Sequence, residues 1–374
     1  DRHELLKSLK KELRALKRKF GDERRTRIIR ETEGKGQKAE GRGQKAEGER
    51  QKAEPRTQKS GAKREVRTIP KDATVEVTRK GAVSWHSPPP SKGKPSGKVD
   101  EIEVYRDRVA GREQMVVVTE SGKAYPLDLN EIPGDGKAAP IIKFMPNSVQ
   151  SKGESFSASF LLPKDLNSVS LVLFSQNGKI KRLAGTELAD LTNRGATLIK
   201  LKEGDRLSYL SWTRDGEDVA IATSGGRVLR FAVDDIQLPL MGRSAQGNQA
   251  TRLRTGEETV GCVALGAKDK LLIVSQLGYA KRIAPSEIRQ TNRGDIGTQV
   301  LQFSHTSDRL AGMVVVPRRD EAIALVTSNH RAIALSIESI SVWKKDGFGD
   351  RVPKLKADEQ VIEVVSPSSF ILGH

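Results

Sequence analysis

The sequence predicts a mainly β protein built as a six-bladed, propeller-like ring, preceded by a short α-helix and a basic linker. Three observations carry this prediction. One segment recurs six times, an acidic turn keeps the same spacing, and each copy contains runs of Val, Ile and Leu bounded by turn residues. Repeats of about 40–50 residues with four strands each are typical of propellers. A β-sandwich is the alternative, but a sandwich does not require the same segment six times.

The recurring segment is an apolar run, a tight turn and a second strand that carries basic residues. Its clearest copy is Leu271–Ile283 (LLIVSQLGYAKRI), in which Gly278 supplies the positive φ of a tight hairpin. In the last copy, Asn329–His330 stands where the others have glycine. The remaining copies are Leu171–Leu183, Val219–Phe231, Ile323–Leu335, Val116–Leu127 and, more faintly, Val75–Trp85.

An acidic turn precedes a further apolar strand in every repeat after the first. Successive acids lie 51, 52, 51 and 50 residues apart, which matches a unit of about 50 residues with three or four strands. The first repeat is irregular and contains the Pro-rich stretch Ser87–Gly97 (SPPPSKGKPSG), as terminal repeats often do. The acids are Glu154, Asp205, Glu257, Asp308 and Asp358.

The charge of the chain favours a polyanionic partner. The 374 residues include 65 Lys and Arg against 48 Asp and Glu, a formal net charge of +17. Such an excess is typical of proteins that bind nucleic acid or an anionic membrane surface, although a merely soluble basic protein is the alternative. Residues 1–70 hold 23 of the basic and 12 of the acidic residues, so a polyanion site in the repeats must come from local clustering.

The first 68 residues predict a helix and a linker. Residues 3–20 follow a heptad pattern and end before Gly21, and we expect residues 1–28 to be the end of a longer coiled-coil helix. Residues 34–54 are three tandem heptapeptides with Ala as their only apolar residue, so residues 29–68 are predicted to be a low-complexity basic linker. The linker either touches DNA phosphates or acts as a solvated spacer. Because the chain begins with Asp1, we interpret it as the carboxy-terminal part of something longer.

The sequence contains no pattern that indicates catalysis or metal binding. Cys262, the single cysteine, lies in the apolar run VGCVAL, which favours a buried structural thiol over a nucleophile. The five histidines are scattered, and no phosphate-binding loop or Ser/His/Asp grouping is visible. We therefore assign no catalytic residue and no metal ligand. No run approaches the roughly 18 apolar residues of a membrane helix.

The predicted site is a band of cations on the rim of the ring. Basic residues collect one, three or four positions after each turn, and repetition places them at equivalent sites where they can follow the phosphates of a curved duplex. The Gly- and Arg-containing loops between turn and acid add one arginine each. The alternative is that these side chains only solvate strands and connections. The set is Lys123, Lys179, Lys181, Arg182, Arg194, Arg227, Arg230, Arg243, Lys281, Arg282, Arg293 and Arg331.

Three features together resemble a known family. They are the G-x-x-K-R pattern after a hydrophobic strand, the x-G-x-R-L-x-x-G-D/E pattern that follows it, and the helix ending KRKFGDERRT at Lys17–Thr26. The sequence resembles the carboxy-terminal region of the A subunit of bacterial type IIA topoisomerases, DNA gyrase and topoisomerase IV. The resemblance covers residues 1–28 and about 69–374, and it implies that residues 69–374 form a six-bladed β-pinwheel.

The resemblance implies a function in DNA topology. A domain of this family binds duplex DNA around its rim and bends it, and in gyrase it wraps the DNA to support ATP-dependent negative supercoiling. The DNA-cleaving tyrosine and the ATP- and Mg-dependent chemistry belong to other parts of the holoenzyme, so no cofactor is expected in this chain. The implied partners are double-stranded DNA, a B subunit in an A2B2 assembly and a second A subunit joined through upstream regions. The resemblance implies a location in the cytoplasm, associated with the nucleoid. It implies no association with a membrane.

One loop departs from the gyrase pattern. Gyrases carry a box close to QRRGGKG on the first blade, whereas the corresponding SPPPSKGKPSG contains Lys92 and Lys94 but no arginine. The departure leaves a topoisomerase IV-like role, bending DNA and selecting substrates, as the alternative to wrapping. A propeller that serves as a protein-interaction scaffold is a further alternative. An enzyme with its active site in the ring would require a central pocket lined by carboxylates or histidines.

Overall fold

The structure is a computed structural model that describes residues 68–87, 98–112, 114–134, 136–317, 323–352 and 355–367. The chain divides into two compact units, residues 1–62 and 63–374, and every described residue lies in the second. The predicted helix over residues 3–20, the heptapeptide linker and residues 88–97 of the Pro-rich loop lie outside the described residues. The domain boundaries near residues 28 and 68 stay predictions.

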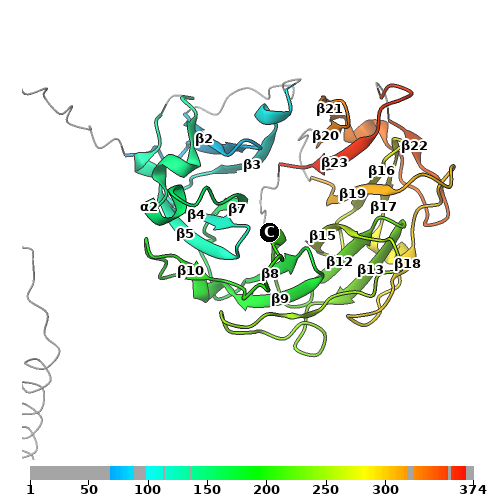
Figure 1. The fold of residues 1–374 in the computed structure, drawn as a ribbon, viewed down its shortest axis with the longest axis horizontal. Coiled ribbons are helices and arrows are strands. Elements are labelled where there is room, and N and C mark those ends of the chain that lie inside the picture. Colours follow the sequence, from blue (N-terminus) through cyan, green and yellow to red (C-terminus); the bar gives the residue numbers. More distant parts are fainter. Residues whose placement is uncertain are drawn as a thin grey trace, which may run out of the picture. The chain divides into compact units, whose positions relative to one another are not determined.

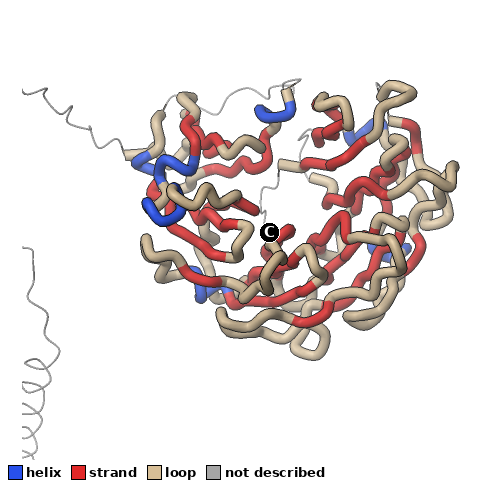
Figure 2. The backbone as a smooth tube through the Cα atoms, viewed as in Figure 1, coloured by secondary structure: helices blue, strands red, loops and turns tan. Residues whose placement is uncertain are grey.

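Six antiparallel sheets follow one another around a common axis in the described part of the second unit (Figures 1 and 2). We number them as blades in chain order. From the axis outward, blade 1 contains β3 (Glu103–Arg108), β1 (Thr74–Thr78), β2 (Ala82–His86) and β6 (Ala139–Pro140). Blade 2 contains β7 (Phe156–Leu161), β4 (Gln114–Thr119), β5 (Lys123–Asp128) and β10 (Ala196–Thr197). Blade 3 contains β11 (Leu207–Thr213), β8 (Ser170–Ser175), β9 (Lys179–Ala184) and β14 (Asn248–Gln249).

The second half of the ring repeats this order. Blade 4 contains β15 (Thr259–Leu265), β12 (Asp218–Thr223), β13 (Arg227–Ala232) and β18 (Thr298–Gln299). Blade 5 contains β19 (Leu310–Val315), β16 (Leu271–Ser275), β17 (Tyr279–Ile283) and β22 (Asp350–Arg351). Blade 6 contains three strands, β23 (Val361–Val365), β20 (Ile323–Thr327) and β21 (Ala332–Leu335). The predicted mainly β fold with six blades is confirmed.

Helical structure in the described residues is confined to short connections. The one α-helix there, α2, spans Asn147–Gln150. The 3₁₀ helices are η1 (Val99–Glu101), η2 (Leu129–Glu131), η3 (Ile141–Phe144), η4 (Gly185–Leu188), η5 (Pro285–Glu287) and η6 (Ile337–Ser339).

Each predicted hairpin forms the two middle strands of one blade. The segment Leu271–Ile283 becomes β16 and β17, paired with Leu271 opposite Ile283, and Gly278 adopts φ +83° at the turn. His330 takes the same left-handed conformation with φ +52° in the last copy. The hairpins are local structures whose turn residues can be recognised in the sequence, which is why all six predictions of their position are confirmed.

The acidic turns hold the hairpin turns of their own blades. In blade 3, Ser175 Oγ accepts from the Lys179 N–H at 3.2 Å and donates to the Asp205 carboxylate at 2.8 Å. In blade 6, Thr327 Oγ1 donates at 2.5 Å to Glu359, one residue beyond the acid expected from the spacing. A buried hydroxyl and a carboxylate thus satisfy backbone N–H groups that the turn leaves unpaired.

The outermost strand of blades 1 to 5 comes from the blade that follows in the chain. For example, β18 follows the hairpin of blade 5 but pairs with β13 of blade 4, and the Val300 N–H then donates to the Gly226 carbonyl at 2.9 Å. Lys98, which follows the hairpin of blade 1, forms the equivalent bridge to Arg331 in blade 6. The exchange therefore also joins the last blade to the first. Sequence analysis missed these strands because two residues carry no readable periodicity.

The hydrophobic core lies between blades. In β12, Val219 and Ile221 pack in a cluster shared with blade 3, whereas Ala220 and Ala222 pack in a cluster shared with blade 5. Successive side chains of a strand point to opposite faces, so a strand between two neighbours is apolar at every position. This arrangement explains the uninterrupted apolar runs in the sequence.

A glycine with positive φ precedes each exchanged strand and lets it approach its neighbour closely. At Gly297, with φ +86°, an added Cβ would lie 2.7 Å from the backbone nitrogen of Leu229 in the preceding blade. Both the dihedral and the contact require glycine at this position. The set is Gly136, Gly195, Gly247, Gly297 and Gly349.

We predict that Gly297→Ala lowers the free energy of unfolding by about 3 kcal/mol, because the methyl group strains the backbone and collides with the neighbouring blade. Gly294→Ala is the matched control, since Gly294 has φ +94° in the same loop with no atom within 4 Å of an added Cβ. We expect that control to cost about 1 kcal/mol. Denaturant unfolding measures both, and equal losses would contradict the close-approach role of Gly297.

Candidate nucleic-acid interface

Two lysines of the predicted cation band are buried and bind backbone carbonyls. The Lys281 ammonium, with 0% of the residue exposed, donates to the carbonyls of Lys344, Lys345 and Gly347 at 2.8, 2.9 and 2.9 Å. Lys181, also 0% exposed, donates to the carbonyls of Leu198, Arg243 and Ala245 at 2.6, 3.0 and 3.4 Å. We call the segment that leads to an exchanged strand in the neighbouring blade a crossing loop. Each ammonium holds the backbone of a crossing loop through these hydrogen bonds.

Burial changes the acidity of both ammonium groups. It lowers the pKa of Lys181 to about 8, and Glu187 opposes that shift. It also lowers the pKa of Lys281 to about 8, and Asp346 and Glu287 oppose the shift. Both groups are therefore protonated at pH 7, where all three of their N–H donors are available to the carbonyls.

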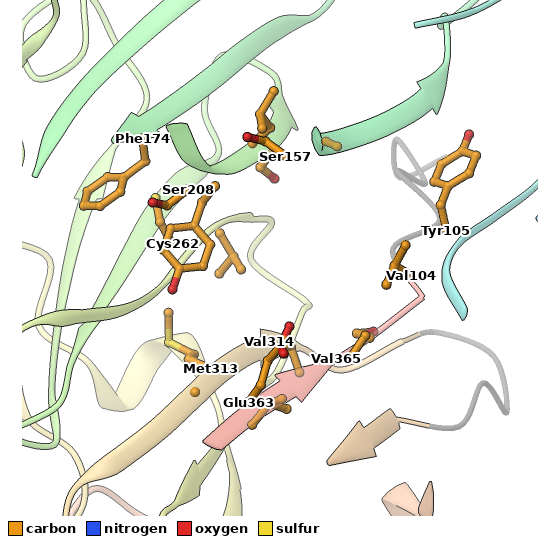
Figure 3. A pocket seen from close by; sticks show the side chains of 18 of the residues that line it. Val104, Tyr105, Ser157, Phe174, Ser208, Cys262, Met313, Val314, Glu363 and Val365 are labelled. Atoms are coloured by element: carbon orange, nitrogen blue, oxygen red, sulfur yellow. The ribbon is translucent and has the colours of Figure 1, made fainter. Parts of the chain in front are cut away.

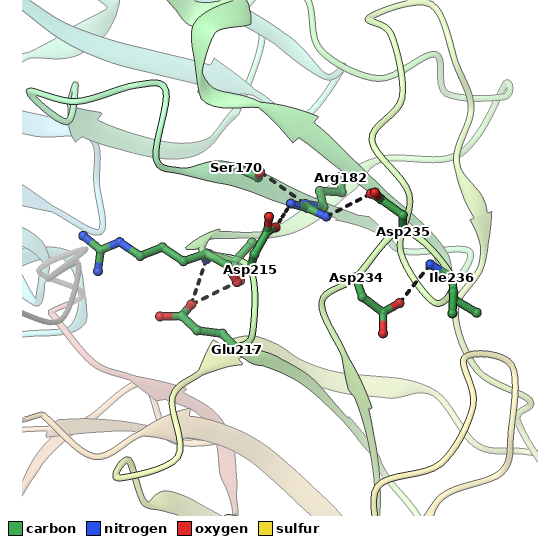
Figure 4. Close-up of polar contacts among 9 residues, drawn as sticks. Ser170, Arg182, Asp215, Glu217, Asp234, Asp235 and Ile236 are labelled. Carbon is green, nitrogen blue, oxygen red and sulfur yellow. Dashed lines mark hydrogen bonds and ion pairs between the residues drawn. The ribbon is translucent and has the colours of Figure 1, made fainter.

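Three arginines of the predicted band bind groups of their own blade and of the next blade. Arg182 forms ion pairs with Asp215 and Asp235 and donates from Nε to Ser170 Oγ at 3.2 Å (Figure 4). Arg227 pairs with Glu257 and donates to the Ile296 carbonyl at 2.7 Å. Arg230 pairs with Asp218 at 2.7 Å and donates to the Pro285 carbonyl at 2.6 Å.

Three further arginines of the band are engaged through their side chains, and Arg282 is engaged through its backbone. Arg243 pairs with Glu187 at 2.7 Å, and Arg331 pairs with Glu359 at 3.0 Å. Arg293 donates from Nη1 to the Gln249 carbonyl at 2.9 Å. The Arg282 backbone is bonded on both sides to the loop around Val342.

The predicted location on the rim is wrong for Lys181, Lys281, Arg182 and Arg227, which are 0–4% exposed. The second strand of each hairpin looked like an outer strand, but the exchanged strand and its crossing loop cover it. Lys123, Lys179 and Arg194, by contrast, have no side-chain partner among the described residues and are partly or fully exposed. For them, contact with DNA stays a prediction.

A second group of cations, which sequence analysis missed, lies where the chain leaves one blade for the next. After β14, the Ala250 N–H donates a hydrogen bond to the Gly178 carbonyl at 2.9 Å. The chain then runs past the hairpin turns of the blades and reaches the next acidic turn. Exposed cations follow there, with no side-chain partner in the described part of the chain. We call them the hairpin-end cations: Lys143, Lys200, Lys202, Arg252, Arg254 and Lys356.

The hairpin-end cations could have been found from the sequence. The patterns K-L-K at residues 200–202 and R-L-R at residues 252–254 lie 52 residues apart, the same interval as the acidic turns Asp205 and Glu257. Together with Lys123 and Lys179, one residue after their turns, they place free positive charge at equivalent points of successive blades. Such an arrangement suits a row of phosphates, because each contact is electrostatic and independent of sequence.

A cavity of about 1140 Å³ lies among the inner strands (Figure 3). Three of its carboxylates are engaged: Glu363 with Arg79 at 2.9 Å, Glu217 with the Arg214 N–H at 3.0 Å, and Asp269 with the Gly266 N–H at 2.8 Å. Cys262 lines the cavity as a free, buried thiol whose pKa burial raises, as expected of a structural residue.

Two other features are absent from the residues that the structure describes. These residues contain no group of three or more His, Cys, Asp and Glu side chains placed to hold a metal ion. None of their helices combines the length and apolar character needed to cross a membrane.

Blades 3, 4 and 5 match a known family one blade at a time. Residues 170–211, 217–265 and 269–317 match the family model described as DNA gyrase C-terminal domain, beta-propeller. The ring belongs to this family. The resemblance seen in the sequence is thereby confirmed. Each matched segment runs from the first hairpin strand of its blade to the inner strand of that blade, and the exchanged outer strands of blades 3 and 4 lie in the next matched segment.

Relatives of the ring are A subunits of topoisomerases. The chain is 31% identical over 315 residues to the A subunit of DNA topoisomerase 4 from Synechocystis sp. (strain ATCC 27184 / PCC 6803 / Kazusa), covering 80% of this chain and 34% of that protein. It is 24% identical over 318 residues to the A subunit of DNA gyrase from the same strain, covering 74% and 36%. The chain thus spans about a third of the length of these relatives.

The fold agrees with a solved structure. The crystal structure of the C-terminal domain of DNA topoisomerase IV matches with a TM-score of 0.64 at 17% identity, over 79% of this chain and 92% of that one.

We predict that Lys281→Met lowers the free energy of unfolding by about 3 kcal/mol, because three carbonyls lose their buried donor. Lys123→Met should change it by less than about 0.5 kcal/mol, since that side chain is partly exposed and has no partner among the described residues. Denaturant unfolding compares the two variants. A loss for Lys123→Met as large as that for Lys281→Met would contradict the structural role of Lys281.

We predict that the chain becomes more stable as the pH rises above 8. Both lysines release their proton near pH 8 when folded but near pH 10.5 when unfolded, so the unfolded state binds more protons between these values. Above about pH 9.5 the tyrosines oppose the trend, because burial raises the pKa of Tyr105 and Tyr209. Unfolding measured at about pH 7.5, 8.5 and 9.5 checks the sign, and Lys281→Met should weaken the slope.

Proposed function

We propose that this ring binds and bends duplex DNA as the C-terminal domain of a type IIA topoisomerase A subunit. The observation that carries the proposal is the recurrence, at equivalent points of successive blades in a ring of this family, of cations whose side chains have no partner among the described residues. A curved row of such charges offsets the elastic energy of bending through many phosphate contacts. The buried Lys181 and Lys281 support the proposal indirectly, because they fix the loops that connect the blades.

A bending role like that of topoisomerase IV fits the chain better than chiral wrapping. The Pro-rich stretch Ser87–Gly97 lacks the arginines of the gyrase box, and of the two relatives from one strain the topoisomerase 4 protein has the greater identity. Wrapping is the second candidate, favoured by the gyrase description of the matching family model. A ligation assay on DNA minicircles separates them, because wrapping gives a chiral change in linking number and bending does not.

The role in a holoenzyme follows from the same proposal. The ring would guide DNA to a cleavage site in the upstream part of an A-subunit dimer. Partner B subunits in an A2B2 assembly would supply the ATP- and Mg-dependent steps in the cytoplasm, at the nucleoid. This chain itself would need no cofactor for its part, since phosphate recognition by Lys and Arg requires none.

We predict that replacing Lys200, Lys202, Arg252 and Arg254 together with Gln weakens duplex binding strongly. Each lost phosphate contact should lower the slope of log K against log salt by about 0.9, so the slope falls by about 3 to 4. Fluorescence anisotropy of a labelled duplex with the full 374-residue chain, at several salt concentrations, measures both quantities.

Matched pairs of charges provide the control. Arg252→Gln/Arg254→Gln removes two charges at the hairpin ends, whereas Lys268→Gln/Lys270→Gln removes two exposed charges at the opposite end of the strands, before β16. Only the first pair should lower the slope. If the quadruple variant binds like the unmodified chain, these four cations do not carry the DNA contact. If deletion of residues 1–68 abolishes binding, the ring is a protein-interaction scaffold.

A further inference from the structure

Three large apolar side chains are exposed together on the crossing loop of residues 341–349, between β21 of blade 6 and β22 in blade 5. Val342 is 49% exposed, Trp343 37% and Phe348 46%. The other large apolar side chains exposed in the described residues are spread over Ile236, Leu240, Leu253 and Ile362. Clustered exposed apolar surface marks a site of interaction, whereas scattered residues of this kind are normal.

The backbone of this loop is fixed from beneath. The Lys281 ammonium binds the carbonyls of Lys344, Lys345 and Gly347, and the Trp343 N–H donates to the Arg282 carbonyl at 2.9 Å. Lys344 and Lys345 follow Trp343 directly in the sequence, and their side chains are exposed although their carbonyls bind the buried ammonium. The loop therefore presents an aromatic ring with two adjacent cations on a preformed backbone.

The indole itself is held in place. An added Cβ at Gly347 would lie 2.4 Å from the Trp343 ring, so the ring rests directly on the glycine backbone. The Ser341 N–H donates to the Asp350 carboxylate at 2.5 Å. Burial of Asp350 raises its pKa, but hydrogen bonds from Ser341 and Trp343 outweigh burial and lower it, so the carboxylate stays ionised beneath the loop. Binding would thus lose little conformational entropy at this side chain.

Building on the proposed DNA-binding function, we propose that this loop is an apolar wedge for duplex DNA. Trp343, flanked by Val342 and Phe348, stacks against the bases of one base-pair step, and Lys344 and Lys345 hold the neighbouring phosphates. Wedges of this kind unstack a step and kink the duplex, which lets the bent DNA contact more protein surface. The two cations favour DNA over a protein partner, since they match phosphates on either side of an opened step.

The wedge places a kink at one point of the ring. The Trp343 N–H donates to the Arg282 carbonyl, and in the two equivalent loops Met241 donates to Arg182 and Thr291 to Arg230, so no second tryptophan stands at these equivalent sites. Bending by the hairpin-end cations is distributed over blades, whereas bending by Trp343 is concentrated between blades 5 and 6. A flexible TA step should be the preferred site of insertion.

The intrinsic fluorescence of the chain tests the wedge. Of the three tryptophans, Trp85 and Trp212 are 7% and 5% exposed, so a change in emission on DNA binding reports Trp343. We expect a duplex with a central TA step to quench the emission, and we expect no quenching in Trp343→Phe. Trp343→Ala should weaken binding about tenfold and reduce the bend measured by energy transfer between the duplex ends. Trp343→Phe should retain most of the bend, because phenylalanine also stacks.

Two further variants make the outcome decisive. Lys344→Gln/Lys345→Gln should lower the salt slope by about 2, and Ile236→Ala, which truncates an exposed apolar residue outside the loop, should change neither bend nor affinity. If the duplex binds in a salt-dependent manner but does not quench the emission of the unmodified chain, and Trp343→Ala leaves the bend unchanged, the wedge is overturned and the proposed DNA-binding function stands. In that case the loop is a surface for a protein. If the unmodified chain binds no duplex even at low salt, the proposed function itself fails.

Discussion

The exchange of one short strand between neighbouring blades is the constraint on which the rest of the ring depends. A two-residue strand forms few hydrogen bonds, so the exchange relies on what surrounds it: a glycine that permits close approach, a carbonyl at the turn, and in blades 3 and 5 a buried lysine. Lys181 and Lys281 each donate hydrogen bonds to three carbonyls. Each ammonium thereby fixes the backbone of a crossing loop. Buried polar groups of this kind stabilise only when every partner is satisfied.

The cations of the ring therefore serve two separate purposes. Most of those within the hairpin strands bind carboxylates of their own or the next blade and carbonyls of the crossing loops, as with Arg182 and Arg227. Those on the connections at the hairpin ends, such as Lys200 and Arg252, have no side-chain partner among the described residues, which leaves their side chains accessible to a phosphate. Charge counted along the sequence does not separate the two groups, because the distinction depends on which strand covers which.

The sequence contains enough information for the hairpins, the acidic turns and the number of blades, since these are local and recur with glycine at the turn. It does not reveal the exchanged strands, which are too short to show a period. For the same reason it misplaces Lys281, whose position three residues after Gly278 is exposed in an isolated hairpin and buried once a crossing loop lies over it. The segments K-L-K and R-L-R were readable but were overlooked beside the stronger hairpin motif.

The exchange also determines when each part of the ring can be finished during synthesis. A blade receives its outer strand only after the next hairpin has left the ribosome, and the segment at Lys98 must wait for Arg331. Until then each newest blade exposes an unpaired edge to other nascent chains. A second copy can supply the missing strand as well as the same chain can, so truncation within the repeats should produce intertwined oligomers in place of smaller rings.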